Sequence, residues 1–431
     1  MYNAGQFMGT PDTISKTFKQ FQLDQRILRA LDEAGFSNCT PIQGECLPDI
    51  LEGRDVAGQA QTGTGKTAAF LLGIFQHLLS GKNPASKSGP RALIISPTRE
   101  LAIQIHKDAC MLGRHTGLKL GLVYGGVDYE KQRASLQAGV DILIGTPGRL
   151  IDYFRQGVFK LKSVEIVVLD EADRMFDLGF IKDIRFMLRR MRSPQERQSM
   201  LFSATLSLRV TELAYEHMNN PRLIRINPDQ ITADRITQIL YHVANDEKIS
   251  LLIGLLQKID PRRTIVFVNT KRTAEKVWGY LEGNRFHAAI LSGDVPQRKR
   301  QKLFKSFSEG ELPILVATDL AARGLHIPDV SHVFNYDLPQ NAEDYVHRIG
   351  RTARAGASGD AVSFACEEFV YSLTDIEEYL KYKLPVVRTD PELLVTPNPP
   401  VKMPVKNSIH KSGGKQSGPR RRGHRNEKRV N

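Results

Sequence analysis

Short apolar runs alternate along the chain with longer segments whose apolar residues recur at helical spacing. The runs are rich in Val, Ile and Leu and almost unbroken, which is typical of strands in a parallel sheet covered by helices on both faces. They form two groups, at residues 92–96, 141–145, 165–169 and 199–203, and then at 264–268, 288–291, 314–317, 332–335 and 361–365. Because strands and helices alternate, the pattern predicts an α/β fold with two tandem domains, each built on a mainly parallel sheet.

A polar stretch without a strong period separates the two groups of strands and predicts a linker. After residue 385 prolines cluster, and Gly, Ser, Lys and Arg then dominate without apolar periodicity, which predicts a disordered basic tail. The predicted division is an N-terminal extension at 1–15, a segment before the first domain at 16–44, the first domain at 45–225, the linker at 226–235, the second domain at 236–385 and the tail at 386–431.

Simple features of the sequence argue against several classes of protein. The longest nearly unbroken apolar run, residues 68–75, is far shorter than the roughly 20 residues that span a bilayer. The N-terminus has no basic segment followed by an apolar core, as a secretory signal would have. The four cysteines form no C-x-x-C pair, which disfavours a zinc site or a disulfide framework and predicts a protein of the reducing cytoplasm.

The net charge of +13 is spread unevenly along the chain. Residues 402–431 hold ten basic residues and one acid, which give +9 and leave only +4 for residues 1–401. This basic end has no Phe, Tyr or Trp to stack on bases, so we interpret it as an electrostatic tether to a nucleic-acid backbone, without sequence preference. A purely solubilising end is the alternative.

The stretch AQTGTGKT nearly matches the phosphate-binding pattern G-x-x-x-x-G-K-[ST], with alanine in place of the first glycine. Glycines let the backbone curl so that N–H groups face phosphate oxygens, the lysine adds positive charge near the β and γ phosphates, and the last threonine offers a hydroxyl to Mg²⁺. A glycine-rich turn with an incidental lysine is the alternative. The candidate nucleotide-binding residues are Ala60, Gln61, Thr62, Gly63, Thr64, Gly65, Lys66 and Thr67.

Two acids follow the predicted strand at 165–169. Ligands of open α/β sheets bind at the carboxyl ends of the strands, so Asp170 and Glu171 are well placed for chemistry. Asp170 suits hydrated Mg²⁺ together with Thr67, and Glu171 suits a residue that orients or deprotonates the attacking water. A solvated helix cap is the alternative for the acids alone; with the phosphate loop they predict hydrolysis of ATP or GTP.

The second domain has no phosphate loop but carries the basic stretch HRIGRTAR. Arg348, Arg351 and Arg354 recur every third residue, and arginine suits planar contact with phosphate. We interpret this element as the source of arginine fingers that reach the γ phosphate from the second domain. A solvated basic helix face is the alternative.

Taken together, VLDEAD, AQTGTGKT and HRIGRTAR resemble the DEAD-box RNA helicase family, and further short motifs follow in the family's order over residues 16–380. The resemblance implies two RecA-like domains, ATP and Mg²⁺ in the site, and RNA as a partner held mainly by its backbone. It implies RNA-stimulated ATP hydrolysis upon domain closure, catalysed by Lys66, Asp170, Glu171, Arg351 and Arg354, with local and non-processive unwinding of short duplexes.

The family's motifs assign further roles. GFSNCTPIQ resembles an adenine-recognising motif in which the amide of Gln43 would read the base edge and Phe18 would stack on the ring. Gly324 and His326 lie in the motif expected near the ATP ribose. The residues expected to couple hydrolysis to unwinding are Asp173, Ser203 and Thr205. The expected RNA-binding residues are Pro97, Thr98, Arg99, Gly125, Gly126, Thr146, Gly148, Arg149, Gln297, Arg300 and Thr318.

Each of these assignments has a structural alternative. Phe18 is equally suited to a hydrophobic core, Arg99 and Arg149 to surface ion pairs, and the three threonines to helix caps. The whole chain also has alternatives, namely a phosphate-loop ATPase acting on DNA or a protein, and an RNA clamp or remodelling scaffold with little hydrolysis. The intact set of catalytic residues and the specific DEAD sequence favour the helicase.

The resemblance is closer still to a bacterial type of DEAD-box helicase. Members of that type are associated with mRNA degradation together with the endonuclease RNase E in a degradosome, and this partner is carried over as an expectation. The sequence departs from many family members at Ala353, where they have Gly, and at His326, where they have Asp. The bacterial type also has His at the second position.

We predict that His326→Asp changes the KM for ATP modestly and leaves kcat largely intact, because the side chain is expected near the ribose and away from the γ phosphate. Steady-state ATPase kinetics at saturating RNA measure both constants. A large loss of kcat would contradict this assignment.

Deletion of the residues after Pro400 is expected to weaken RNA affinity and flatten its salt dependence, because fewer counterions are released when fewer phosphates are neutralised. Binding titrations over a range of salt concentrations measure the slope. ATP hydrolysis at saturating RNA serves as the control and should be retained, whereas an unchanged slope would argue for a solubilising end.

Overall fold

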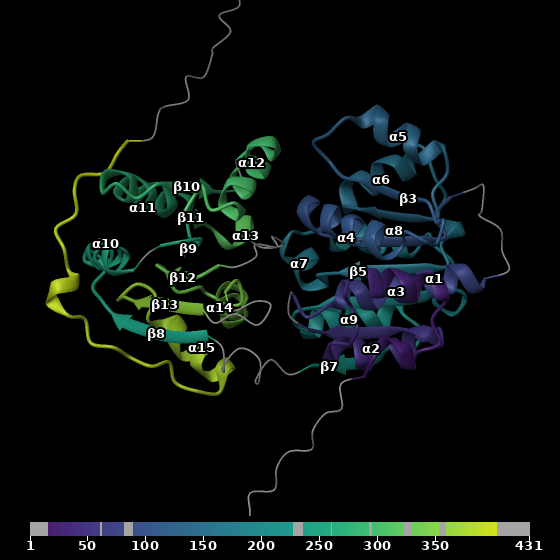
Figure 1. Ribbon diagram of the computed structural model, residues 1–431, viewed down its shortest axis with the longest axis horizontal. Helices are drawn as coiled ribbons and strands as arrows, with labels where there is room; N and C mark the ends of the chain where they lie inside the picture. The colour runs from purple at the N-terminus through teal and green to yellow at the C-terminus, as the bar shows by residue number, and fades with distance from the viewer. Residues whose placement is uncertain are drawn as a thin grey trace, which may run out of the picture.

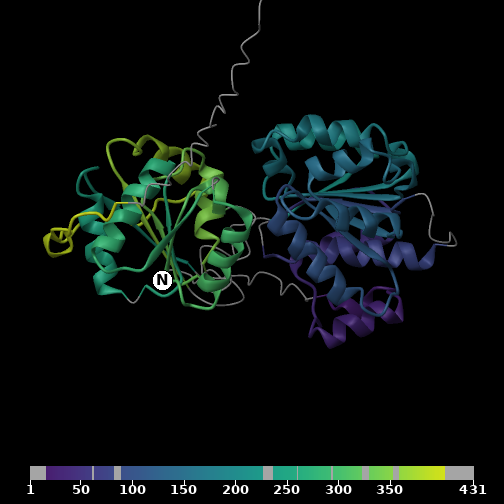
Figure 2. The ribbon, with the colours of Figure 1, turned by 90° about the horizontal axis from the view of Figure 1, so that it is seen from above.

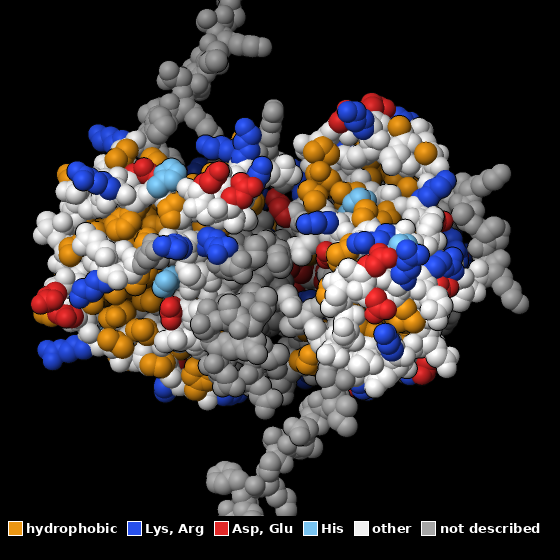
Figure 3. Space-filling model, viewed as in Figure 1, with side chains coloured by type: hydrophobic (Ala, Val, Ile, Leu, Met, Phe, Trp, Pro, Cys, Tyr) orange, Lys and Arg blue, Asp and Glu red, His pale blue; other side chains and the backbone are white. Residues whose placement is uncertain are grey.

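The computed structural model describes residues 16–60, 63–81, 89–226, 236–259, 261–292, 295–322, 330–352 and 359–402. They form two α/β domains that lie side by side (Figures 1 and 2). No helix in these ranges is long and apolar enough to cross a membrane. On the face shown in Figure 3, Lys and Arg side chains are interspersed with Asp and Glu, in keeping with the small net charge of residues 1–401.

The first domain is built on a seven-stranded sheet with the strand order β3-β4-β2-β5-β6-β1-β7, in which every recorded pair is parallel. Its elements are η1 (Phe18–Gln20), α1 (Gln25–Glu33), α2 (Pro41–Leu51), β1 (Val56–Gln59), α3 (Lys66–Ser80), β2 (Ala92–Ile95), α4 (Arg99–Leu112), β3 (Leu120–Val123), α5 (Tyr129–Gln137), β4 (Ile142–Gly145), α6 (Pro147–Arg155), η2 (Leu161–Ser163), β5 (Ile166–Asp170), α7 (Ala172–Asp177), α8 (Ile181–Leu188), η3 (Pro194–Glu196), β6 (Gln198–Ser203), α9 (Leu208–His217) and β7 (Arg222–Arg225).

The second domain has a six-stranded sheet with the order β10-β11-β9-β12-β13-β8, again with parallel pairs. Its elements are β8 (Ile236–His242), α10 (Lys248–Lys258), β9 (Thr264–Phe267), α11 (Lys271–Gly283), β10 (Ala288–Leu291), α12 (Gln297–Ser308), β11 (Ile314–Ala317), α13 (Asp319–Ala322), β12 (His332–Asn335), α14 (Ala342–Ile349), β13 (Gly359–Ala365), α15 (Tyr371–Leu380) and η5 (Pro391–Leu393). Residues 227–235, which make up most of the predicted linker, lie outside the described ranges.

All nine predicted strands are confirmed to within two residues, and the two-domain α/β architecture is confirmed with them. The sequence did not predict β1, β3, β7 and β8. Three of these, β3, β7 and β8, are edge strands, whose side chains are not buried on both faces and therefore lack an unbroken apolar run. The fourth, β1, has the sequence VAGQ, which is not a continuous apolar run; at its Gly58 a Cβ would lie 2.8 Å from the ring of Phe202.

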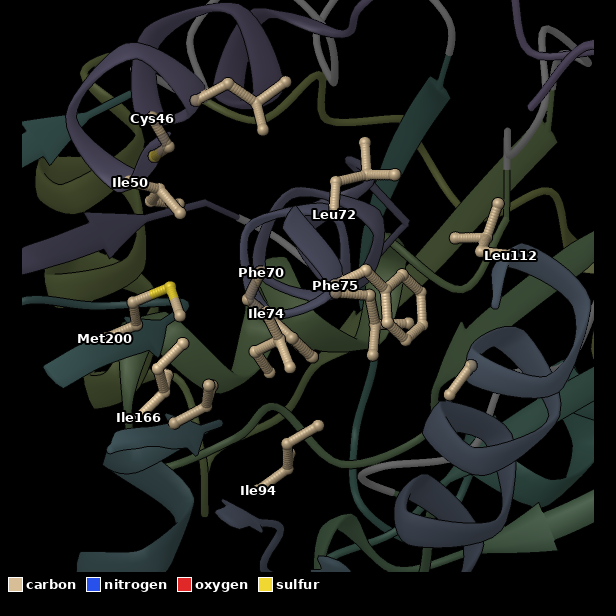
Figure 4. Close-up of a cluster of buried hydrophobic side chains, with 14 of the residues drawn as sticks. Cys46, Ile50, Phe70, Leu72, Ile74, Phe75, Ile94, Leu112, Ile166 and Met200 are labelled. Atoms are coloured by element: carbon tan, nitrogen blue, oxygen red, sulfur yellow. The ribbon is translucent and has the colours of Figure 1, made fainter. Parts of the chain in front are cut away.

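Helix α3 is fixed in the first domain by burial of most of its length. Phe70, Leu72, Ile74 and Phe75 are fully buried and pack in one cluster with strand residues such as Ile94 (Figure 4). Burying each large apolar side chain contributes about 1.5–3 kcal/mol relative to exposure. Because α3 begins at Lys66, this packing also fixes where the phosphate-binding loop meets its helix.

The end of the second domain corrects the predicted tail boundary. Residues 386–402, which we call the strap, were expected to be disordered but run along the outer side of this domain (Figure 1). They begin beside the edge strand β8, where the N–H of Val387 donates to the carbonyl of Leu240, and end where the N–H of Val401 donates to Gly279 of α11. Leu393 packs in the core cluster of α10 and α11. The clustered prolines and the lack of apolar periodicity suggested disorder, but backbone contacts, which leave no such pattern in the sequence, hold much of the strap. The remaining tail, 403–431, lies outside the described ranges.

Three glycines allow the strap to approach the helices closely. A Cβ added at Gly254 would lie 2.0 Å from the carbonyl oxygen of Leu393, at Gly279 2.8 Å from that of Val401, and at Gly283 2.2 Å from that of Pro399. Each of these partners is a backbone atom, which cannot rotate away as a side chain can. The strap therefore belongs to the packed structure of the second domain.

We predict that Gly254→Ala lowers the free energy of unfolding by about 1–3 kcal/mol, because the added methyl forces the strap away from α10. Urea or thermal unfolding measures this loss. Gly44→Ala is the matched control, since Gly44 is also buried in a helix but the nearest atom to its Cβ would be Cδ of Lys16, at an ordinary contact distance of 3.4 Å. Equal stability of the Gly254→Ala and wild-type proteins would show that the strap is not tightly packed.

Candidate active site

The phosphate-binding loop joins β1 to α3 at the carboxyl edge of the first sheet. Gly63 and Gly65 have φ angles of 88° and 90°, a left-handed conformation that glycine adopts without strain. The ammonium group of Lys66 is buried and donates to the carbonyl of Ala60, which directly follows β1. The predicted turn-and-helix geometry is therefore present, while Gln61 and Thr62 lie outside the described ranges.

Gln43 connects α2 to this loop. Its Oε1 accepts from the N–H of Thr40 at 2.8 Å, and its Nε2 donates to the carbonyl of Gly65 at 3.0 Å. A Cβ at Gly65 would lie 2.4 Å from that Nε2, so only glycine fits between the amide and the loop. These bonds use one of the two Nε2 donors and one of the two Oε1 lone pairs, so the amide keeps one donor and one acceptor for an adenine edge.

Phe18 takes its structural alternative. Only 2% of its surface is exposed, and it belongs to the same buried cluster as α3. No open ring face remains for a base, so the expectation that Phe18 stacks on adenine is corrected to a role in the core. Residue type alone did not distinguish these two roles, because both require an aromatic side chain.

Asp170 and Glu171 lie at the end of β5, close to the phosphate loop. Burial raises the pKa of the Asp170 carboxyl to about 7, and the charge of Lys66 opposes that shift. Glu171 is a non-glycine residue with φ 52° and ψ 54°, a strained conformation of the kind that costs about 1–3 kcal/mol and clusters at active sites. Its Oε2 is buried and has no hydrogen-bond partner among the described residues.

The predicted coupling residues form one hydrogen-bonded connection between β6 and α7. The hydroxyl of Ser203 accepts from the N–H of Asp173 at 3.2 Å, and the carboxylate of Asp173 accepts from the N–H of Ala204 at 3.2 Å. Movement of the loop after β6 is therefore linked to the helix that follows Glu171. Thr205 lies directly after this connection and is buried.

The two domains share a cavity of about 370 Å³ next to these residues. Lys66, Glu171, Asp173 and Thr205 line it from the first domain, and Glu343, His347 and Arg351 line it from α14 and the residues that follow it. Arg351 is 4% exposed, so its guanidinium group lies within the interface rather than in solvent. The structure therefore brings one predicted finger together with the predicted lysine and base. Arg354 lies outside the described ranges.

Arg348 has a different role from Arg351. It is 1% exposed and makes a bidentate pair with Asp319, with Nε–Oδ1 and Nη2–Oδ2 distances of 2.7 and 2.6 Å. The expectation of a single cationic element is thus corrected, because Arg348 faces the interior of its own domain. Arg348 belongs to α14, which ends at Ile349, whereas Arg351 follows the helix and lines the shared cavity.

The predicted RNA-binding residues of the first domain gather at the same sheet edge. The guanidinium of Arg99 lies against Gly126, where a Cβ would be 2.4 Å from Nη1, and Gly126 has φ 85°. Gln132 holds the start of this loop by accepting from the N–H of Tyr124 and donating to its carbonyl. Gln132 was missed by sequence reasoning, although its place on the helix after the two glycines was visible.

Arg149 follows the buried Pro147 at the start of α6, near exposed Gly148. Its guanidinium carbon lies 4.9 Å from the ring centre of Tyr129 and 5.5 Å from that of Tyr153. Among the described residues the contacts of this arginine are with these two aromatic side chains, and no ion pair, its structural alternative, is recorded there. Such stacking fixes the plane of the guanidinium group.

The remaining predicted RNA residues have mixed outcomes. Thr98 caps α4 by accepting from the N–H of Leu101, whereas Thr146 precedes α6 without a side-chain cap. Arg300 on α12 reaches across to the first domain, where its Nη1 lies 3.5 Å from Oε1 of Glu100. For four other residues the structure gives a location but no contact that indicates a role. Pro97 is buried and Gly125 lies beside Arg99, while Thr318 lies between β11 and α13 and Gln297 begins α12. Gly324 and His326 lie outside the described ranges.

The acid Glu343 was also missed by sequence reasoning. Burial raises the pKa of its carboxyl, and the neighbouring His347 opposes the shift. It lines the shared cavity opposite Asp173 and Thr205, so it belongs to the interface of the two domains. Its only signal in the sequence was its place four residues before His347.

Comparisons with known proteins agree with this arrangement of motifs. The DEAD/DEAH box helicase profile matches residues 40–213, and the helicase conserved C-terminal domain profile matches residues 247–356. A protein of Shewanella halifaxensis named ATP-dependent RNA helicase RhlB is 55% identical over 421 residues, which cover 94% of this chain and 97% of that protein. A Pasteurella multocida protein of the same name is 55% identical over 92% of this chain and 93% of its own length.

Solved structures of similar proteins share the whole two-domain arrangement. Dbp5 of S. cerevisiae, bound to RNA and ADP BeF3, matches with a TM-score of 0.77 and 31% identity over 87% of this chain and 96% of that chain. Mss116p bound to ssRNA and AMP-PNP matches with a TM-score of 0.78 and 29% identity over 89% of this chain and 83% of that chain. The chain therefore belongs to the DEAD-box family of ATP-dependent RNA helicases.

Proposed function

We propose that RNA stimulates ATP hydrolysis by this chain and that the cycle separates short RNA duplexes locally, without processive movement. The observation that carries the proposal is the cavity shared by Lys66, Glu171 and Arg351, which come from both domains. Lys66 and Glu171 come from the first domain and Arg351 from the second, so the proposed finger meets the lysine and the base only where the two domains meet. A ligand that favours closure of the domains would therefore favour hydrolysis.

In the proposed reaction Lys66 and the loop N–H groups hold the phosphates, and Arg351 stabilises negative charge that develops at the γ phosphate. Glu171 accepts the proton of the attacking water, since its unpartnered Oε2 faces no competing donor among the described residues. An arginine finger raises kcat by about 10³–10⁵ where it has been measured. We propose a similar part for Arg354.

The residues near the phosphate loop suit Mg²⁺. Asp170 and Thr67 offer oxygen donors, which Mg²⁺ prefers, and a buried carboxyl with a raised pKa gains from an adjacent cation. When bound, Mg²⁺ would neutralise phosphate charge. Its remaining ligands would be water and phosphate oxygens, because the described residues contain no group of three or more His, Cys, Asp or Glu side chains placed to hold a metal ion.

We propose that RNA lies along the edge formed by Arg99, Gly126, Arg149 and Arg300, held by its phosphates and hence with little sequence preference. Support comes from two similar proteins, Dbp5 and Mss116p, whose structures were solved with bound RNA and ssRNA, respectively. An RNA clamp with little hydrolysis is the alternative, and the strained, buried Glu171 argues against it, because a clamp has no use for a poised base.

The likeness to several proteins named RhlB supports a finer proposal, that this chain acts in bacterial mRNA degradation with RNase E in the cytoplasm. Mixing the purified proteins and measuring complex formation by analytical ultracentrifugation tests the partnership. Absence of a complex at micromolar concentrations would contradict it and leave the helicase proposal standing.

We predict that Lys66→Ala and Glu171→Gln abolish RNA-stimulated hydrolysis and that Arg351→Ala lowers kcat by about a thousandfold or more. ATPase rates measured with RNA, with DNA of equal length and with neither test all three variants and the nucleic-acid preference. Arg29→Ala, at an exposed pair on α1, is the control and should be active. Persistent hydrolysis by Glu171→Gln would refute the base assignment, and equal stimulation by DNA would refute RNA specificity.

A further inference from the structure

Lys248 is a buried charged residue that has no role in the proposed reaction. It is the first residue of α10 and is 0% exposed. Its Nζ lies 2.6 Å from Oδ1 of Asp337, which follows β12 and is 2% exposed. The same Nζ lies 4.3 Å from the ring centre of Tyr336 and 5.3 Å from that of Phe369, so aromatic rings replace the water around the ammonium.

Asp337 connects Lys248 to Arg348, both directly and through Asn269. Its Oδ2 accepts from the N–H of Asn269 at 2.9 Å, and its main-chain oxygen accepts from Nη1 of Arg348 at 2.5 Å. Asn269 returns a second bond, because its Oδ1 accepts from Nη2 of Arg348 at 2.8 Å. With the bidentate pair to Asp319, the Arg348 guanidinium donates to Asp319, Asp337 and Asn269.

The network joins two parts of the domain that serve different partners in the proposed function. Asp319 directly follows Thr318, at the RNA side, and Arg348 lies three residues before Arg351, in the shared cavity. Replacing a buried ion pair by apolar residues is often neutral or even stabilising, so stability alone does not explain the buried Lys248–Asp337 pair beside the half-buried Arg348–Asp319 pair. A need to keep the Thr318–Asp319 segment and the segment of Arg348 and Arg351 in a fixed relative position would explain them.

We propose that Lys248 is a positioning residue for hydrolysis, which acts through Asp337 and Arg348 to hold Arg351 in register with the RNA-side segment at Thr318. Without the ammonium, the carboxylate of Asp337 would be buried uncompensated and would move toward other donors. The main-chain oxygen and the Asn269 contact that orient Arg348 would then shift. This inference rests on the proposed function, because it concerns how Arg351 reaches its working position.

The test compares Lys248→Met with the double variant Lys248→Met/Asp337→Leu, using thermal unfolding and RNA-stimulated ATPase kinetics. Lys248→Met should lower both Tm and kcat, since it leaves a buried charge unpaired. The double variant should regain Tm, while its kcat stays about tenfold to a hundredfold below wild type and its KM for ATP changes by less than about threefold. Lys258→Met, at the exposed last residue of α10, is the matched control.

A merely structural pair would give a different result. If the double variant regained Tm and also the wild-type kcat, the positioning role would be overturned. A wild-type protein that hydrolyses ATP without any response to RNA would instead refute the proposed function, so the two failures are distinguishable.

A double-mutant cycle with Arg351→Ala gives a second, independent measurement. Because Lys248 is proposed to act through Arg351, Lys248→Met should slow single-turnover hydrolysis in the wild-type background and have little further effect when Arg351 is alanine. Equal losses in both backgrounds would overturn the proposal. Asp319→Asn, which keeps the shape of the partner but weakens the pair with Arg348, replaces Lys248→Met in the cycle if the latter does not fold.

Discussion

The site depends on one constraint, that parallel strands place all their carboxyl ends at the same edge of a sheet. In the first domain this edge presents the phosphate loop after β1, the acids after β5 and the serine that ends β6. In the second domain it presents Asp319 after β11 and Asp337 after β12. Because the interface cavity lies between groups from these edges, residues more than a hundred positions apart share one small space.

The two edges are built differently although their sheets are alike. The first is open enough for a glycine-rich loop and keeps strained backbone at Glu171. The second is filled by its own charges, with Lys248 against Asp337 and Arg348 against Asp319. Because these ion pairs occupy the carboxyl edge of the second sheet, it has no room for a triphosphate, but it can hold α14 rigidly. We regard this division between a binding edge and a supporting edge as the reason that only one domain needs a phosphate loop.

The sequence predicted those features whose physical signal is local. Central strands were found because burial on both faces requires a continuous apolar run. The phosphate-binding loop and the acids Asp170 and Glu171 were found because each is recognised from residues that are adjacent in the sequence. Edge strands such as β3 and β8 lack that run and were missed. The roles of Phe18 and Arg348 were left open or misjudged, and Lys248 was not noticed. Each of these depends on contacts with distant residues, such as the one between Lys248 and Asp337, 89 positions apart.

The strap has a consequence for competition between segments. It already covers the outer faces of α10 and α11, and glycines make those faces fit its backbone closely. A foreign extended peptide could occupy the same faces only by displacing a segment that is covalently attached and therefore present at a very high effective concentration. A partner of the second domain is therefore expected to bind at another surface, where it does not compete with the strap. A partner that binds at these faces would bind slowly, because the strap must dissociate first.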